Sequence, residues 1–188
     1  MRTTLLVFTL ILFGLYVAVG YNFTKVAGFP LTKVRSASTP AELRPQTNTL
    51  CTRDERVIFS CPVKKPAKIV SVCASKDLTR DRGYLQYRFG LPGKIELEFP
   101  KDRTGTQQKF QYTHYFRARV DLTEINFTID GYQYQVFDTY QGEEKPAISS
   151  QGVSVTAPGK PKEVSFVCRT RPKADYTDLQ AVLGSDQE

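Results

Sequence analysis

The chain has 188 residues, a formal net charge of +7 and four cysteines. Its length allows one domain with a substantial core, and its positive charge favours anionic partners at long range without indicating a fold. The sequence has no Cys-x-x-Cys pair and no Gly-rich phosphate loop. This pattern argues against a zinc site, a redox motif and a nucleotide-binding loop.

Residues 1–20, MRTTLLVFTLILFGLYVAVG, have the features of a signal peptide. Arg2 is the only charged residue, and Ala18 and Gly20 place small side chains at the −3 and −1 positions of a cleavage site before Tyr21. An uncleaved membrane anchor is the alternative, because the uncharged run is barely as long as the about 20 residues that span a bilayer. We therefore expect a periplasmic or secreted protein, with a membrane contact only through this segment if it is uncleaved.

Residues 21–50 predict a flexible tether. They contain Pro30, Pro40 and Pro45, many Ser and Thr residues, and apolar residues without a period. The remaining residues, 51–188, are expected to form one β domain.

Two β-branched runs, RVIFSC at 56–61 and KIVSVCAS at 68–75, predict a hairpin with a Pro- and Lys-containing loop. An even number of cysteines behind an export signal predicts two disulfides. In this hairpin Cys61 lies near the loop and Cys73 near the open end, roughly 10 Å or more apart at about 3.3 Å per residue. A disulfide needs Cα atoms within about 7 Å, so Cys61–Cys73 is disfavoured. The sequence favours Cys51–Cys73 with Cys61–Cys168, and Cys51–Cys61 with Cys73–Cys168 stays open.

The segment 83–100, GYLQYRFGLPGKIELEFP, predicts a second hairpin. With a five-residue loop at 90–94, one register places apolar side chains opposite each other and charged side chains opposite polar or charged ones. The expected pairs are Phe89–Ile95, Tyr87–Leu97, Leu85–Phe99, Arg88–Glu96 and Gln86–Glu98. We interpret the Arg88 pair as an exposed one that helps to fix the register and contributes at most about 1 kcal/mol.

The segment 109–120, KFQYTHYFRARV, predicts one strand with two distinct faces. Its inner face carries His114, the only histidine, which we expect in the core with a backbone or hydroxyl partner. Its outer face carries Tyr115, Arg117 and Arg119, our candidate binding residues. Basic and aromatic side chains on one face suit an anionic glycan, a lipopolysaccharide phosphate or an acidic protein. They also suit nucleic acid, which an exported protein rarely meets, so no nucleic-acid partner is expected.

The segment 124–137, EINFTIDGYQYQVF, is the clearest hairpin in the chain. Asp130-Gly131 suits a two-residue type I′ turn, because both residues tolerate positive φ. The expected pairs are Ile129–Tyr132, Phe127–Tyr134, Ile125–Val136, Thr128–Gln133 and Asn126–Gln135.

Further strands are expected at 152–156 and 163–168, and the spacing of Tyr176, Leu179, Val182 and Leu183 predicts a short C-terminal helix. The total is eight or nine antiparallel strands with short connections. We therefore expect an all-β fold, either an antiparallel β-sandwich or a small barrel, with two disulfides.

The sequence gives little support for an enzymatic function. Serine or cysteine nucleophiles usually need a base such as histidine, the cysteines are expected to be oxidised, and no metal-ligand spacing occurs. We expect no catalytic residues, no cofactor and no metal. A concave pocket of polar groups near His114 would argue against this interpretation of His114.

The segments VIFSC, IVSVCAS, GYLQYRFG and ELEFP, in that order, resemble an uncharacterised family of exported bacterial proteins over roughly residues 50–140. This resemblance implies periplasmic export and adds no mechanism. The expected architecture is also similar to that of periplasmic lysozyme inhibitors, which is an analogy of fold alone; the basic charge disfavours docking on lysozyme, itself strongly basic.

We expect an exported, non-catalytic β domain that binds an envelope or extracellular partner, either a protein or an anionic ligand. The alternatives are a periplasmic inhibitor or immunity-type protein against a hydrolase or toxin, and an envelope enzyme of unknown class.

Overall fold

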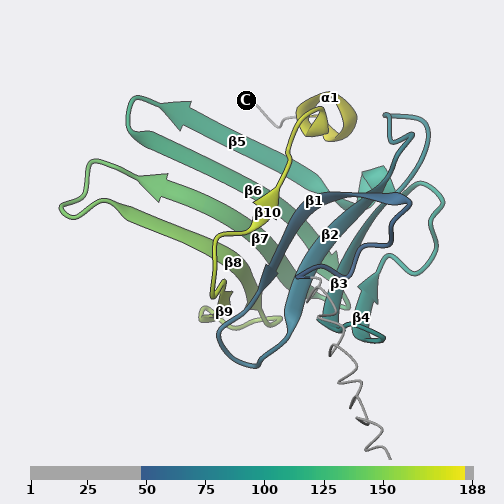
Figure 1. The fold of residues 1–188 in the computed structure, drawn as a ribbon, viewed down its shortest axis with the longest axis horizontal. Coiled ribbons are helices and arrows are strands. Elements are labelled where there is room, and N and C mark those ends of the chain that lie inside the picture. The colour runs from purple at the N-terminus through teal and green to yellow at the C-terminus, as the bar shows by residue number, and fades with distance from the viewer. Residues whose placement is uncertain (1–47, 185–188) are drawn as a thin grey trace, which may run out of the picture. The chain divides into compact units, whose positions relative to one another are not determined.

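The computed structural model of the chain describes residues 48–184. The predicted signal peptide and most of the predicted tether lie outside the described residues. Within them the strands form two antiparallel sheets of five strands each (Figure 1), which confirms the all-β prediction. The described strands form a sandwich of two separate sheets rather than a closed barrel, and they number ten rather than eight or nine.

The first sheet contains the strands β1 (Glu55–Pro62), β2 (Ile69–Ser75), β3 (Leu85–Leu91), β4 (Lys94–Phe99) and β10 (Lys173–Ala174), in the order β10-β1-β2-β3-β4. The second sheet contains β5 (Gln111–Arg117), β6 (Val120–Ile129), β7 (Tyr132–Gln141), β8 (Ile148–Thr156) and β9 (Glu163–Val167), in sequence order. The 3-10 turn η1 (Thr106–Lys109) precedes β5, and the predicted C-terminal helix is α1 (Leu179–Leu183).

The core lies where the inner faces of the two sheets meet. The Tyr87 ring of the first sheet lies 4.9 Å from the Phe127 ring of the second, and Phe99 lies 5.5 Å from Phe127. Ile58, Leu85 and other apolar side chains of the same faces are fully buried. Each fully buried side chain of this size contributes about 1.5 to 3 kcal/mol, so this contact holds the sheets together.

The hairpin of β6 and β7 has the predicted register. All five expected pairs are present, from Ile129–Tyr132 to Ile125–Val136. Asp130 and Gly131 have φ angles of 49° and 81°, as the turn type requires.

The register of the hairpin of β3 and β4 differs from the prediction by two residues. Arg88 lies opposite Glu98 rather than Glu96, and Tyr87 lies opposite Phe99. The turn comprises two residues, 92–93, instead of five, and the register shifts at Gly90. Because side chains alternate with period two, a shift of two keeps Arg88, Tyr87, Leu97 and Phe99 on their predicted faces and changes only their partners. Ile95 differs: the irregularity pairs it with Gly90 instead of Phe89, and it is 44% exposed.

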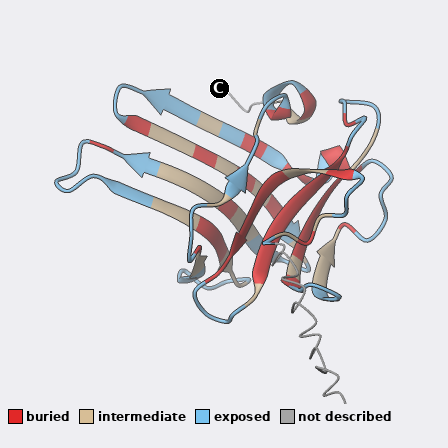
Figure 2. Cartoon of the chain, in the orientation of Figure 1, coloured by how far each residue is buried: buried red, intermediate tan, exposed pale blue. Residues whose placement is uncertain are grey.

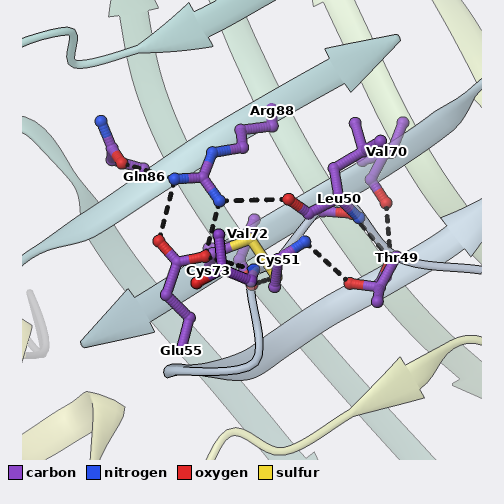
Figure 3. Close-up of a disulfide and its surroundings, with 12 residues drawn as sticks. Thr49, Leu50, Cys51, Glu55, Val70, Val72, Cys73, Gln86 and Arg88 are labelled. Carbon is purple, nitrogen blue, oxygen red and sulfur yellow. Dashed lines mark hydrogen bonds and ion pairs between the residues drawn. A yellow bond between two sulfur atoms is a disulfide. The ribbon is translucent and has the colours of Figure 1, made fainter. Parts of the chain in front are cut away.

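Arg88 is buried, so its expected exposure is wrong. Its guanidinium group contacts the carboxylate of Glu55 and the carbonyl oxygen of Leu50 (Figure 3). It also contacts the carboxylate of Glu98 and the side-chain oxygen of Gln86. The cause is that residues 48–52 lie across the outer face of the first sheet, which the alternation alone marks as solvent-exposed.

The two predicted disulfides, Cys51–Cys73 and Cys61–Cys168, are confirmed, with Cα atoms 5.4 and 5.7 Å apart. Cys51–Cys73 holds the covering segment against β2 (Figure 3). Leu50, at the end of the predicted tether, is buried, and its N–H donates to the Ser71 hydroxyl at 2.9 Å. Leu50 therefore belongs to the packed domain.

The prediction of a single strand over residues 109–120 is wrong at the C-terminal end of this segment. Strand β5 stops at Arg117, the chain reverses through Ala118 and Arg119, and β6 begins at Val120. Arg119 has a φ angle of 66°, an uncommon conformation for a residue that is not glycine. The sequence offers no Gly, Asn, Asp or Pro to indicate this turn.

Within residues 48–184, none of the helices has the length and apolar character that crossing a membrane requires.

Candidate functional site: a polar cleft on the second sheet

The second sheet extends beyond the first. Figure 1 shows the connected ends of β5 and β6 and of β7 and β8 projecting past β1–β4. The register aligns the inner-face side chains of β5–β8 in rows across the sheet. The row that still faces the first sheet is apolar and buried; it consists of Tyr112, Ile125, Val136 and Val153.

The next two rows on the same face are mostly polar. The first is His114, Thr123, Asp138 and Gln151, and the second is Phe116, Asp121, Tyr140 and Ser149. We call residues 114–123 and 138–151 the distal half of the second sheet. Burial decreases toward the distal half along β5 and β8 (Figure 2), whereas Val120 and Thr123 of β6 stay buried. One strand face therefore changes from core to polar surface where the opposing sheet ends.

The C-terminal segment 171–180 encloses this polar surface. Strand β10 pairs with β1, and α1 packs near β5. The result is a cleft of about 970 Å³, which we call the polar cleft. Its walls are Tyr112, His114, Asp121, Thr123, Asp138, Tyr140, Ser149 and Gln151 from the sheet, and Arg171, Tyr176, Asp178 and Gln180 from the C-terminal segment.

His114 opens into the polar cleft, so the expectation of a core histidine is wrong. Its side chain is 37% exposed, and Nε2 lies 3.0 Å from the Asp121 carboxylate. The inner face of β5 does continue to His114 as predicted, but the first sheet does not reach that far. A pocket of polar groups beside His114 is the observation that argues against a purely structural role.

Tyr176 connects the C-terminal segment to the sheet. Its hydroxyl donates to Asp138 at 3.1 Å. Burial, followed by the charge of Asp138 and the hydrogen bond to it, raises the pKa of Tyr176 above its usual value. The hydroxyl therefore stays protonated and keeps donating to the carboxylate across the physiological range.

Arg56 of β1 also binds the C-terminal segment. Its guanidinium group lies 3.9 Å from Asp175 and 3.8 Å from Asp178, and it donates to the carbonyl oxygen of Thr177. These contacts hold the backbone that carries Tyr176, so the wall of the cleft is fixed by both sheets.

Two aromatic rings on this face are open to solvent. Tyr140 is 45% exposed in the cleft wall, and Phe116, 72% exposed, lies in the same row on β5, separated from Tyr140 by Asp121 of β6. Flat apolar rings next to carboxylate, amide and hydroxyl groups can hold a ligand with both C–H surfaces and hydroxyl groups.

A serine triad is incompatible with the register. Ser149 lines the cleft together with His114, but β6 and β7 separate their strands. Three strand spacings of about 4.8 Å place the two backbones roughly 14 Å apart. The two cleft carboxylates on the sheet are closer: Asp121 pairs with Tyr140 and Asp138 with Thr123, which makes them diagonal neighbours at about 7 to 8 Å between Cα atoms.

The predicted binding residues lie outside the cleft. Tyr115 is 50% exposed on the outer face of β5, and Arg117 on the same face pairs with both carboxylate oxygens of Glu143. Arg119 lies in the turn and donates to the carbonyl oxygen of Gly142. The structure thus separates Arg119 from the strand face of the other two, and their binding role stays a prediction.

One group of potential metal ligands is present among residues 48–184, formed by Cys51, Glu55 and Cys73. Both sulfur atoms are in the disulfide, and the carboxylate of Glu55 is engaged by Arg88. These atoms are therefore committed to other bonds.

Sequence reasoning missed most of the polar cleft, although a signal existed. Asp121 and Thr123 are in phase with Ile125, and Asp138 and Tyr140 are in phase with Val136. When polar residues follow core residues on the same face of a strand, the strand extends beyond the part of it that the opposing sheet covers. Tyr176 was expected only as a helix residue.

Comparison with known proteins found no matching family model, no matching curated protein and no matching solved structure. The function is therefore argued from the polar cleft.

Proposed function

We propose that this chain is a non-catalytic, extracytoplasmic binding protein that holds an uncharged glycan in the polar cleft. The observation that carries the proposal is the change of one strand face from buried apolar rows to rows of Asp, Gln, Ser, Thr and exposed aromatic side chains.

The chemistry of the side chains fits a sugar. Carboxylate oxygens accept hydrogen bonds from ring hydroxyls, and amide and hydroxyl groups can both donate to them and accept from them. Tyr140 and Phe116 offer aromatic faces that carry partial negative charge and attract the polarised C–H groups of a sugar ring. A volume of about 970 Å³ holds a few sugar units.

The charge of the cleft favours an uncharged ligand. Asp121, Asp138 and Asp178 are opposed by Arg171 and by His114 when protonated. A polyanion would meet these carboxylates, so the anionic partner expected from the net charge is not the ligand we propose for this site.

Two further arguments support an extracytoplasmic location. Disulfides persist in oxidising compartments such as the periplasm and the extracellular space. Residues 1–20 also have the pattern of an export signal.

A glycoside hydrolase is the second candidate, because Asp121 and Asp138 are diagonal neighbours in an open cleft. Paired carboxylates about 5 to 10 Å apart perform this reaction in most glycosidases. We favour binding without catalysis because both carboxylates already have partners, Asp121 with His114 and Asp138 with Tyr176.

The test is a glycan array with neutral, amino-substituted and acidic members, followed by calorimetry with the strongest neutral oligosaccharide. Tyr140→Ala should weaken binding roughly tenfold, since it removes one aromatic contact. Tyr115→Ala is the matched control: it removes a tyrosine of similar exposure from the opposite face of the same sheet, and should change the affinity less than twofold.

Two outcomes would overturn the proposal: no binding to any neutral glycan, or equal losses for the two tyrosine variants. Release of reducing ends from the bound oligosaccharide, abolished by Asp138→Asn, would favour the hydrolase instead.

A further inference from the structure

A second concave surface lies at the other end of the same inner face. The rows of the second sheet continue from the core to Tyr134, Val155 and Val164, which are aligned across β7, β8 and β9. Val164 is 56% exposed although its cross-strand partner Val155 packs against the core. The inner face of edge strand β9 is therefore incompletely covered by the first sheet.

This opening is a groove of about 630 Å³ with aromatic and aliphatic walls, which we call the apolar groove. Phe89 of β3 lies 5.9 Å from Phe166 of β9, and Tyr87 lies 5.9 Å from Tyr134. These rings connect the two sheets at the groove. The walls are thus held by packing against the core, and the groove is a preformed feature.

The charge around the groove is positive. Among the described residues that line it, the charged ones are Lys160 and Lys162, in the connection between β8 and β9. Within residues 48–184 neither lysine has an ion pair. Asp130, in the turn before β7, acts on Tyr134 of the wall, so an acidic group also lies near this part of the groove.

We propose that the apolar groove binds a single-chain anionic amphiphile, with its hydrocarbon chain between the two sheets and its head group at Lys160 and Lys162. The apolar walls account for the chain, and the unpaired lysines at the rim account for the charge. The volume falls in the range of small-molecule sites, about 300 to 1,000 Å³, and suits one chain rather than a bilayer surface. This inference is independent of the glycan proposal, because the apolar core row lies between the two sites.

Calorimetry with dodecanoate and dodecyltrimethylammonium, both as monomers, tests the sign of the head group. Dodecanoate should bind at least tenfold more tightly than the cation of equal chain length. Octanoate, decanoate and dodecanoate should follow each other in steps of about tenfold, because each step buries two more methylenes.

Variants locate the site. Lys160→Glu with Lys162→Glu should abolish the preference for dodecanoate over the cation. Lys145→Glu with Lys173→Glu is the matched control, since it makes the same change in net charge outside the groove lining. Val164→Gln, at an exposed position, should weaken dodecanoate binding, and Tyr140→Ala in the polar cleft should leave it unchanged.

Equal binding of both amphiphiles, or an equal effect of both lysine pairs, would overturn the proposal. So would an absence of dodecanoate binding together with a dimer that Val164→Gln converts to a monomer. That result would assign the groove to a second copy of the chain.

Discussion

The guanidinium group of Arg88 donates two hydrogen bonds to the carboxylate of Glu55, at 2.6 and 2.8 Å. The side chains of Arg88 and Glu55 are only 3% and 1% exposed. Glu55 also accepts from the N–H of Thr52 and from the hydroxyl of Tyr84. A buried ion pair is tolerated when its remaining hydrogen-bonding capacity is satisfied, as it is in this network.

Removing one partner should be strongly destabilising. Arg88→Met leaves the Glu55 carboxylate buried without its cation, and should lower the free energy of unfolding by about 3 to 5 kcal/mol. Adding Glu55→Gln removes the uncompensated charge, so the double variant should be more stable than Arg88→Met alone. Urea denaturation of the four proteins of this cycle measures both effects. If the losses of unfolding free energy in the two single variants add up to the loss in the double variant, the two residues act independently.

Acid should weaken the same pair. Burial would raise the pKa of Glu55, but hydrogen bonds from Arg88, Thr52 and Tyr84 and the charge of Arg88 lower it from 4.5 to about 2. A depressed folded-state pKa gives stability that is fully present above pH 4.5 and is lost as the pH falls toward 2. The titration of Glu55 should lower the free energy of unfolding by roughly 3 kcal/mol as the pH falls through this range.

Denaturation at a series of pH values between these limits checks this prediction. Glu55→Gln has no carboxylate to titrate at this position, so its unfolding free energy should depend less steeply on pH. Identical slopes for the two proteins would show that Glu55 titrates alike in the folded and unfolded states.

The two disulfides should contribute unequally. Cys61–Cys168 joins residues 107 positions apart, and Cys51–Cys73 joins residues 22 apart. Loop-closure entropy predicts losses of about 5 kcal/mol for Cys61→Ala with Cys168→Ala and about 3 kcal/mol for Cys51→Ala with Cys73→Ala. Urea unfolding of the two double variants measures the difference, and the reverse order would contradict the entropic account.

The stability of the C-terminal wall of the polar cleft should depend on the hydroxyl group of Tyr176. Tyr176→Phe removes the donor to Asp138 and should cost about 1 kcal/mol. Amide hydrogen exchange should accelerate at Leu179 and Val182, whose N–H groups close the turns of the same segment. Tyr140→Phe, on the opposite wall, is the control. Equal exchange rates in both variants would show that Tyr176 does not hold the segment.

The sequence predicts those parts of the fold that local chemistry determines. The hairpin at Asp130-Gly131 follows from a two-residue turn and matching alternation on both strands. The reach of the hairpin that contains Cys61 and Cys73 argues against a disulfide between these two residues, which leaves two pairings of the four cysteines. The residues that decide each of these arguments, Asp130 and Gly131 in one and Cys61 and Cys73 in the other, are close together in the chain, so few alternatives compete.

Other features depend on contacts that alternation cannot specify. A shift of two residues leaves Arg88 on the same face of the β3–β4 hairpin, so alternation does not determine its partner. The burial of Arg88 depends on a covering segment held by Cys51. The site around His114 depends on where the first sheet ends relative to β5, which is a property of the packed sheets.

The central claim is that ligand binds on the inner face of the distal half of the second sheet. Backbone amide chemical-shift mapping with the neutral oligosaccharide selected on the array tests it most directly. The account predicts the largest changes at Thr123, Asp138, Tyr140 and Gln151, along the walls of the polar cleft. Changes centred on Tyr115 and Arg117, with these four amides unmoved, would contradict it and return the binding site to the outer face.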